Sequence, residues 1–345
     1  MKKRFFKVVT IILAFIFIFI IGEILTRGYY FLKYTKLGSN GPCIILDKEL
    51  GFSPAPNYVL DGKKSDIIGK SYSVKCTTDS NGFRIFGNPQ ETIKKKVLFL
   101  GDSFTYAEEV SDEKTYFGIL KKDLSIETFA FGCKGYGTLQ EYIILDKWLD
   151  KIRPDIIVIQ FCSNDFINNH YELELRSKCH NNGMRRPYLT KNGIIYKNPN
   201  NFSVIRDFAN KYSRFLYVII SLIDRLNVTV DTSTVENIIE DQGLLYPYYK
   251  ESVEITERLI KKIKLRTPST TLIYAFSADY SMPYHKEFKR ISKENGIYFI
   301  DGIPQLMEYS EKNGVPTRTE DGVHWNETGH QIVAYALQEY FKSHW

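Results

Sequence analysis

The chain has 345 residues, 43% of them hydrophobic and 25% charged, and this globular composition excludes a mostly disordered protein. The 46 Lys and Arg residues exceed the 40 Asp and Glu residues, but four of the basic residues lie within the first seven positions. Without those four, the counts are 42 against 40, a net charge of +2 for residues 8–345. A nucleic-acid-binding protein would carry its positive charge on the folded part, so the composition does not favour one.

The first predicted element is a helix that spans a membrane. The apolar run over residues 5–25 has 21 residues, and as a helix it would extend about 31 Å, close to the bilayer core of about 30 Å. The basic residues before it predict a cytoplasmic N-terminus, with the rest of the chain outside the cytoplasm. Residues 20–22 lack the small-residue pattern of a signal-peptide cleavage site, which favours a retained single-pass anchor. Glu23, near the far end of the span, can extend its carboxylate to the interface.

Changes in composition along the chain divide it into three predicted segments. Residues 1–27 form the membrane anchor, and residues 28–95 form a turn-rich preamble with short strands near residues 71–76 and 83–85. Residues 96–345 alternate strand and helix patterns and are predicted to form an α/β domain, which an insertion at about residues 166–242 interrupts.

Five short runs rich in apolar and β-branched residues in the last segment predict strands that are covered on both faces. They lie at residues 96–100, 126–131, 155–161, 271–276 and 297–300. Helical spacing between and after them predicts helices at residues 139–152, 256–265, 283–294 and 326–341, the last with Asn326 as its N-cap. Strands that alternate with helices indicate a parallel sheet, here of five strands.

The insertion has its own local patterns. Residues 187–196 predict a β-hairpin, because Asn192-Gly193 stands between two apolar runs. Residues 202–226 predict an apolar-rich helix. A lid, a substrate wall, a partner surface and simple extra packing are all compatible with these patterns.

Polar residues cluster directly after three of the strands, where ligands bind in an open parallel sheet. Gly101-Asp102-Ser103 follows the first strand, the glycine-rich stretch 132–138 the second, and Ser163-Asn164-Asp165 the third, while Asp321 and His324 lie in a late loop. Each motif alone is compatible with a turn or a helix cap.

Together these motifs predict a nucleophilic serine and its helpers. The hydroxyl of Ser103 needs a general base, which His324 can supply, and Asp321 three residues earlier can orient the imidazole. An oxyanion needs hydrogen-bond donors aimed at one point. The backbone N–H groups of Ser103 and Gly135 and the side-chain amide of Asn164 can provide them.

The four blocks, in this order and on these elements, resemble the SGNH hydrolases, also called the GDSL family. The resemblance covers residues 96–345 with the insertion unmatched, and implies a flavodoxin-like three-layer α/β/α sandwich. It also implies ester hydrolysis or acyl transfer through a serine acyl-enzyme, without a metal or a cofactor.

The sequence departs from the family pattern at three positions beside the site. Cys162 stands where the family often has Gly, Ala130 where it usually has Asn, and Phe104 where the lipases have Leu. The family's strand order would place the first strand between the second and the third. Cys133 and Cys162 would then lie about 10 Å apart, too far for a disulfide.

Three functions remain open from the sequence. The first is a membrane-anchored esterase or deacylase acting on an acyl or acetyl ester, with a cell-envelope or extracellular carbohydrate as the expected substrate. The second is an O-acyltransferase that uses the same residues to acylate a polysaccharide. The third is a non-catalytic, surface-anchored module. A metal-dependent phosphoesterase and a nucleotide-binding protein are disfavoured, since the sequence has neither a second set of His and Asp ligands nor a phosphate-binding loop.

Overall fold

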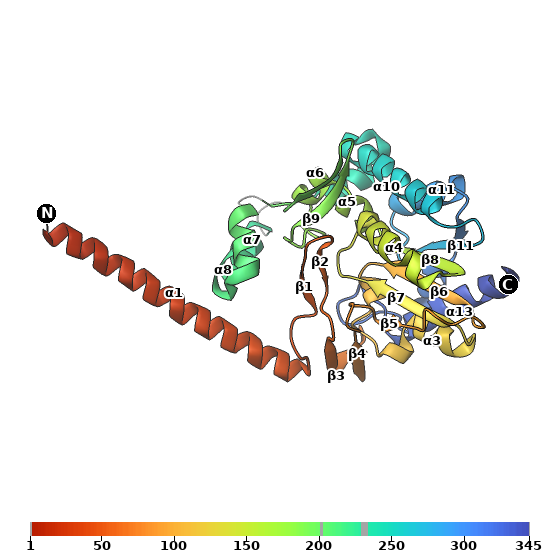
Figure 1. The fold of residues 1–345 in the computed structure, drawn as a ribbon, viewed down its shortest axis with the longest axis horizontal. Helices are drawn as coiled ribbons and strands as arrows, with labels where there is room; N and C mark the ends of the chain where they lie inside the picture. Colours follow the sequence, from red (N-terminus) through yellow and green to blue (C-terminus); the bar gives the residue numbers. More distant parts are fainter. Residues whose placement is uncertain (1, 201–202, 229–233, 345) are drawn as a thin grey trace.

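A six-stranded sheet with helices on both faces forms the centre of the molecule (Figure 1). The computed structural model describes residues 2–200, 203–228 and 234–344. The strands lie in the order β12-β11-β8-β6-β7-β5. Their bounds are β5 (Ile85–Phe86), β6 (Lys96–Gly101), β7 (Glu127–Gly132), β8 (Ile156–Phe161), β11 (Leu272–Ser277) and β12 (Tyr298–Ile300).

The predicted α/β/α sandwich with five parallel strands is confirmed, and β6 lies between β7 and β8 as the family resemblance implied. The short strand β5 was not predicted as part of this sheet. It pairs antiparallel with the edge of β7, with Ile85 opposite Ala130. Cys133 and Cys162 follow β7 and β8 on either side of β6, and both thiols are free and buried.

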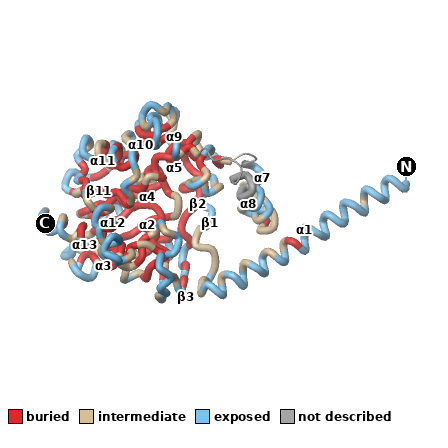
Figure 2. Tube along the Cα trace, turned by 180° about the vertical axis from the view of Figure 1, so that it is seen from behind, coloured by how far each residue is buried: buried red, intermediate tan, exposed pale blue. Residues whose placement is uncertain are grey.

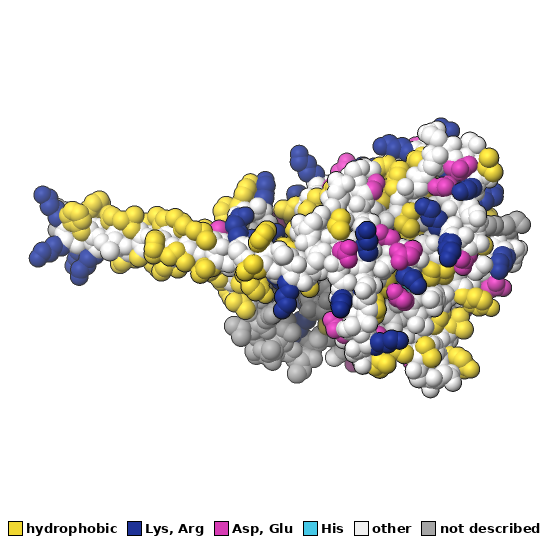
Figure 3. Space-filling model, turned by 90° about the horizontal axis from the view of Figure 1, so that it is seen from below, with side chains coloured by type: hydrophobic (Ala, Val, Ile, Leu, Met, Phe, Trp, Pro, Cys, Tyr) yellow, Lys and Arg dark blue, Asp and Glu magenta, His cyan; other side chains and the backbone are white. Residues whose placement is uncertain are grey.

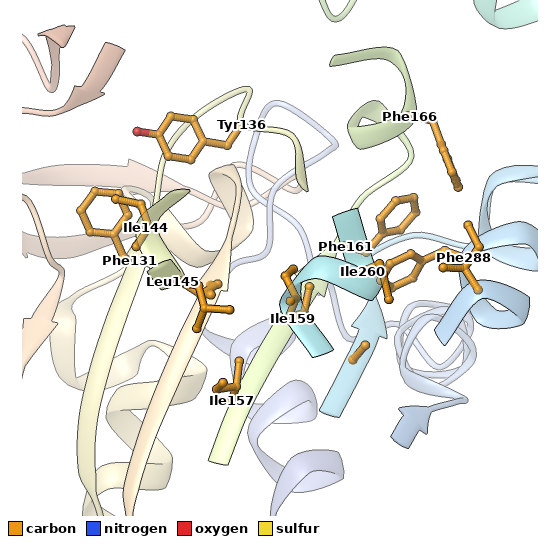
Figure 4. Close-up of a cluster of buried hydrophobic side chains, with 14 of the residues drawn as sticks. Phe131, Tyr136, Ile144, Leu145, Ile157, Ile159, Phe161, Phe166, Ile260 and Phe288 are labelled. Atoms are coloured by element: carbon orange, nitrogen blue, oxygen red, sulfur yellow. The ribbon is translucent and has the colours of Figure 1, made fainter. Parts of the chain in front are cut away.

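Alternate residues of each strand enter two separate cores, one on each face of the sheet. Leu98 and Leu100 of β6 belong to the core beneath α4 (Thr138–Ile152), α10 (Pro247–Arg266) and α11 (Tyr284–Glu294). Figure 4 shows this core, in which Ile144 of α4 lies beside Phe131 of β7. Val97 and Phe99 enter the opposite core, beneath α3 (Tyr116–Asp123), α12 (Ile303–Lys312) and α13 (Glu327–His344).

The four helices predicted outside the insertion are all present, with shifted ends. The helix predicted from residue 256 begins earlier, because Pro247 opens α10 and Pro is favoured in the first helical turn. Asn326 is the N-cap of α13, since its Oδ1 accepts the Gly329 N–H at 3.1 Å. The short helices near the sheet are α2 (Ser103–Tyr106), α5 (Asn164–Asn168) and α6 (Tyr171–Arg176).

In its described residues, the insertion contains the short helix α6, a hairpin and three further helices. The hairpin pairs β9 (Arg186–Thr190) with β10 (Gly193–Lys197) as predicted, but its two-residue loop is Lys191-Asn192, and Gly193 begins β10. The single helix predicted over residues 202–226 is instead two helices. Ser213 separates α7 (Ser203–Tyr212) from α8 (Arg214–Val228), because its Oγ accepts the Leu216 N–H at 3.1 Å and so caps α8. Phe202 lies outside the described residues, and α9 (Val235–Gln242) ends the insertion.

The preamble forms two antiparallel hairpins that pack against the α/β domain. They are β1 (Ile44–Asp47) with β2 (Gly51–Pro54), and β3 (Val59–Ser65) with β4 (Ser71–Thr77). The strand predicted at residues 71–76 is therefore confirmed. The 3-10 turns η1 (Asp112–Lys114) and η2 (Gly243–Leu245) complete the elements.

Helix α1 (Lys2–Leu37) projects away from the domain as a continuous helix of 36 residues (Figure 1). Its side chains are exposed along almost all of its length (Figure 2), and apolar side chains cover its surface (Figure 3). The helix is long and apolar enough to cross a membrane. By the same test it also fits a signal sequence.

Arg84, at the end of the preamble, organises the segment that follows α2. The side chain is buried and donates hydrogen bonds to the backbone carbonyls of Tyr106, Ala107 and Val110. It also forms an ion pair with Asp112 at 2.8 Å. Three buried carbonyls and a carboxylate therefore depend on one guanidinium.

Replacing Arg84 by Ala is expected to lower the free energy of unfolding by about 3 kcal/mol or more, because these acceptors lose their donor in a buried place. Urea unfolding of the purified protein measures this change. The control is Lys48→Ala at an exposed position, which should change stability by less than about 0.5 kcal/mol. Equal effects of the two variants would contradict the role assigned to Arg84.

Candidate active site

Ser103 lies at a tight strand-to-helix turn at the carboxyl end of β6. It is the first residue of α2, and Asp102 before it is the N-cap, accepting the Phe104 N–H at 3.0 Å. Gly101 needs to be glycine, since a Cβ there would come within 2.3 Å of Gln160 Oε1 on the neighbouring strand β8. Gln160 Oε1 in turn accepts the Asp102 N–H at 3.1 Å, which ties the turn to β8.

Asp321 and His324 form a close pair on the loop before α13. His324 Nδ1 and Asp321 Oδ2 lie 2.6 Å apart, and Asp321 Oδ1 accepts the N–H groups of Val323 and His324 at 2.8 and 2.9 Å. Burial alone would raise the pKa of Asp321, but these hydrogen bonds, led by that of the His324 ring, hold it well below its usual value. Asp321 is therefore a carboxylate at neutral pH and favours the imidazole tautomer with its proton on Nδ1.

The ring of Phe104 brings the serine turn and the histidine loop together. Its centroid lies 5.3 Å from that of His324 and 4.5 Å from that of Trp325. Trp325 is buried in the core, with 1% of its surface exposed, and so it fixes the position of the neighbouring His324. Ser103 is thus adjacent in sequence to a ring that touches His324. No hydrogen bond joins the Ser103 hydroxyl to His324 among the residues that the structure describes.

The preamble forms backbone hydrogen bonds with the loop that carries Asp321 and His324, a role that its sequence did not predict. The Glu320 N–H donates to the Ser65 carbonyl at 3.0 Å, and the Ile67 N–H donates to the Arg318 carbonyl at 3.1 Å. Both partners on the preamble side lie at the tip of the β3–β4 hairpin. The position of Asp321 therefore depends on a segment some 250 residues earlier in the chain.

Gly135 and Asn164, the other predicted site residues, follow the carboxyl ends of β7 and β8 and lie close together. Gly135 has φ of +73°, a conformation that favours glycine. Asn164 Nδ2 donates to the carbonyl of Tyr136 at 3.3 Å and to Asn168 Oδ1 at 2.9 Å. Both N–H bonds of this amide are engaged, so Asn164 can donate to an oxyanion only by releasing one of them.

Asp279 is a polar residue near the site that sequence reasoning missed. It follows β11, and its Oδ2 accepts the Ser163 hydroxyl at 2.6 Å and the Ser163 N–H at 3.1 Å. The contact fixes the start of the turn that carries Asn164. A search for polar residues after every strand run, not only the first three, would have found it.

Three carboxyl groups are buried together behind the serine turn: Asp102, Glu141 and Asp165. Burial raises the pKa of Asp102 to about 6. Burial also raises the pKa values of Glu141 and Asp165 well above their usual range, and the nearby carboxyls add to the effect. Neither oxygen of Glu141 has a hydrogen-bond partner among the described residues, so Glu141 is protonated in the folded protein.

The raised pKa of Glu141 makes stability depend on pH. The folded protein keeps a proton that the unfolded chain releases above about pH 4.3, so stability falls as the pH rises through this range. Glu141→Gln removes the titrating group and should raise the melting temperature at pH 8 by about 2–4 °C. It should also lessen the fall between about pH 5 and pH 8, to which the raised pKa values of Asp102 and Asp165 still contribute. Thermal unfolding at several pH values measures both effects.

The exposed carboxylate Glu254 supplies the control, since Glu254→Gln should follow the wild-type pH dependence. If Glu141→Gln lowered the melting temperature equally at every pH, Glu141 would not be the titrating group.

Ser103 thus lies at a strand-to-helix turn at the carboxyl edge of the parallel sheet, and the Phe104 ring next to it contacts the histidine of a His–Asp pair. Residues 99–332 match the GDSL-like lipase/acylhydrolase family. The chain belongs to this family and is an ester-hydrolysing enzyme. In the described part of the chain, no group of three or more His, Cys, Asp or Glu side chains is placed to hold a metal ion.

No curated protein matches the chain. Among solved structures, it is similar to the psychrotrophic esterase EstA from Pseudoalteromonas sp., at 12% identity with a TM-score of 0.41, over 72% of this chain and 98% of that chain. It is also similar to Axe2, an acetylxylan esterase from Geobacillus stearothermophilus, at 15% identity with a TM-score of 0.39, over 72% of this chain and 95% of that chain.

Proposed function

We propose that the protein is a serine esterase or deacylase in which Ser103, His324 and Asp321 form the catalytic triad. Ser103 Oγ attacks the ester carbonyl, His324 Nε2 takes its proton and later gives it to the leaving alcohol, and Asp321 stabilises the imidazolium. The observation that carries the proposal is the 2.6 Å contact between His324 Nδ1 and Asp321 Oδ2, with the imidazole against Phe104. This contact leaves Nε2 as the basic nitrogen.

The oxyanion of the tetrahedral intermediate would be bound by the backbone N–H groups of Ser103 and Gly135 and by the amide of Asn164. Two observations support this set. The turn at Ser103 opens a helix, where N–H groups lack helical partners, and Asn164 already donates to the carbonyl of the residue after Gly135. Binding would exchange one acceptor of the Asn164 amide for the oxyanion.

A carbohydrate ester is the substrate class that the surroundings support best. A cavity of about 280 Å³ lies between the insertion loop and helices α7 and α8, and its lining includes Asn181, Asn182, Asn200 and Asn210. Asn182 also reaches the proposed oxyanion site, since a Cβ at Gly135 would lie 3.1 Å from its Nδ2. Amide side chains donate and accept hydrogen bonds, which suits sugar hydroxyls better than an aliphatic chain.

We further propose that α1 is a retained single-pass anchor, with a cytoplasmic N-terminus and the catalytic domain outside the cytoplasm. Gly22 supports retention. A Cβ there would lie 2.7 Å from the ring of Phe215, so residues at the far end of the apolar run pack against the folded part. A segment that is cleaved off would have no need of this fit.

Product analysis tests the proposed reaction. The full-length protein in detergent micelles is incubated with an O-acetylated polysaccharide, and the products are separated into free acetate and acetylated acceptor. The proposal expects free acetate, formed only when Ser103 is present. Acetyl groups that move onto a second, unacetylated glycan would instead identify an O-acyltransferase, in which a sugar hydroxyl rather than water attacks the acyl-enzyme.

A further inference from the structure

Helices α7 and α8 expose an apolar surface that the domain does not cover. We call these two helices the α7–α8 hairpin; its side chains are described from Val204 to Ile223. Val204, at the start of α7, is 80% exposed. Large apolar side chains exposed on the two helices are Val204, Ile205, Phe208, Tyr212, Tyr217, Ile219, Leu222 and Ile223. An apolar surface of this kind on a folded protein marks a contact with a partner or a membrane.

The start of α8 is attached to the anchor helix through Glu23. The carboxylate of Glu23 accepts the Ser213 hydroxyl at 2.9 Å and the N–H groups of Arg214 and Phe215, each at 3.1 Å. These are the N–H groups that a helix leaves unpaired at its beginning, where a negative charge is favoured. Glu23, which the sequence predicted only to extend its carboxylate to the membrane interface, therefore also caps α8.

Apolar contacts strengthen the same junction. The ring of Phe215 rests on Gly22, and its centroid lies 5.9 Å from that of Phe19. Arg27 donates from the anchor to the Tyr212 carbonyl at 3.2 Å. Figure 3 shows apolar side chains running along the projecting helix and gathering again where it meets the rest of the molecule. The apolar surface of the hairpin is thus next to that of the anchor.

With α1 across a bilayer as proposed, the junction would lie at the depth of the membrane surface. Glu23 is 18 residues after Phe5, which corresponds to about 27 Å along a helix, near the far boundary of a hydrocarbon core of about 30 Å. The polar cap made by Glu23 is then at the level of the lipid headgroups. An apolar helix that starts at this level can lie in the interface with its side chains among the upper parts of the acyl chains.

We infer that the α7–α8 hairpin is a second membrane contact, and that its partner is the lipid surface on the side where α1 leaves the bilayer. This inference rests on the proposed anchoring by α1. Two contacts would fix the orientation of the domain relative to the membrane, whereas α1 alone would let it rotate. Because α7 and α8 also line the Asn-rich cavity, that cavity would be held next to the headgroups.

Tryptophan quenching by brominated lipids tests the inference. The full-length protein is reconstituted in phosphatidylcholine vesicles with or without bromine on the acyl chains. The variants are Val204→Trp on α7 and Ile219→Trp on α8, both at exposed positions. The matched control is Leu265→Trp on α10, an apolar side chain that is 86% exposed. The wild-type protein, with its three tryptophans, gives the baseline.

The added emission of Val204→Trp and Ile219→Trp should be largely lost in brominated vesicles, while that of Leu265→Trp is kept. If both hairpin variants keep their emission, the hairpin does not contact lipid. Its apolar face would then be the binding surface for a protein partner or a second copy of the chain. Extraction with alkaline carbonate is measured in parallel. Release of the wild-type protein would reject the anchor itself, whereas retention without quenching would reject the hairpin contact alone.

Discussion

Ser103→Ala is expected to lower kcat on p-nitrophenyl acetate by at least about 1,000-fold. The proposed acyl-enzyme cannot form without the hydroxyl, and any remaining rate would come from oxyanion stabilisation and substrate binding alone. Removing one oxygen from a side chain that is 9% exposed and makes no hydrogen bond within the described chain should leave the melting temperature close to that of the wild type. Steady-state kinetics and thermal unfolding of the full-length protein in detergent measure both.

Ser269→Ala, at an exposed serine before β11, is the control for this substitution and should keep full activity. If Ser103→Ala kept a near-wild-type kcat, Ser103 would not be the nucleophile. A loss of activity accompanied by a large fall in melting temperature would assign Ser103 a structural role instead.

Asp321→Asn is expected to lower kcat by about 1,000- to 10,000-fold, because an amide in place of the carboxylate no longer favours the proton on His324 Nδ1 and cannot stabilise the imidazolium. A carboxyl group whose pKa is lowered by folding adds stability above its unfolded pKa of about 3.9 and loses it only when the pH falls through the folded value. The pKa of Asp321 is lowered in this way. Wild-type Asp321 therefore remains a carboxylate from about pH 5 to pH 9, so the loss of activity in the variant should persist throughout this range.

Glu320→Gln, which changes the exposed carboxyl next to Asp321, is the matched control. A pH–rate profile for each variant separates the effects. If Asp321→Asn matched the wild type at neutral pH, the pair would not take part in catalysis, and the 2.6 Å contact would only fix the shape of the loop.

The central sheet was predictable because its strands carry a simple signal. Stretches such as residues 97–100 and 156–159 are apolar at every position, since both of their faces are covered by helices. The order of β7, β6 and β8 came from the family resemblance. A short strand was predicted near residues 83–85, but its place at the edge of the central sheet was not, because β5 has only two residues, Ile85 and Phe86, and depends on β7 for its hydrogen bonds.

Contacts between distant segments were beyond prediction from one sequence. Nothing in the residues around Glu23 indicates that its partners are the N–H groups of residues 214 and 215. The preamble shows no catalytic motif, yet the β3–β4 hairpin holds the loop of Asp321 through backbone hydrogen bonds, which leave no mark on side-chain identity. The commitment of Asn164 to Tyr136 and Asn168 likewise follows from the fold.

Covalent labelling by a fluorophosphonate tests the central claim most directly. The reagent phosphonylates a serine whose hydroxyl is activated by a neighbouring base, so the full-length protein should gain one adduct. Mass spectrometry of the peptides should locate it on Ser103, and His324→Ala should abolish it. An adduct on another residue, or no adduct in a preparation that hydrolyses p-nitrophenyl acetate, would contradict the assignment of Ser103 and His324 as the reacting pair.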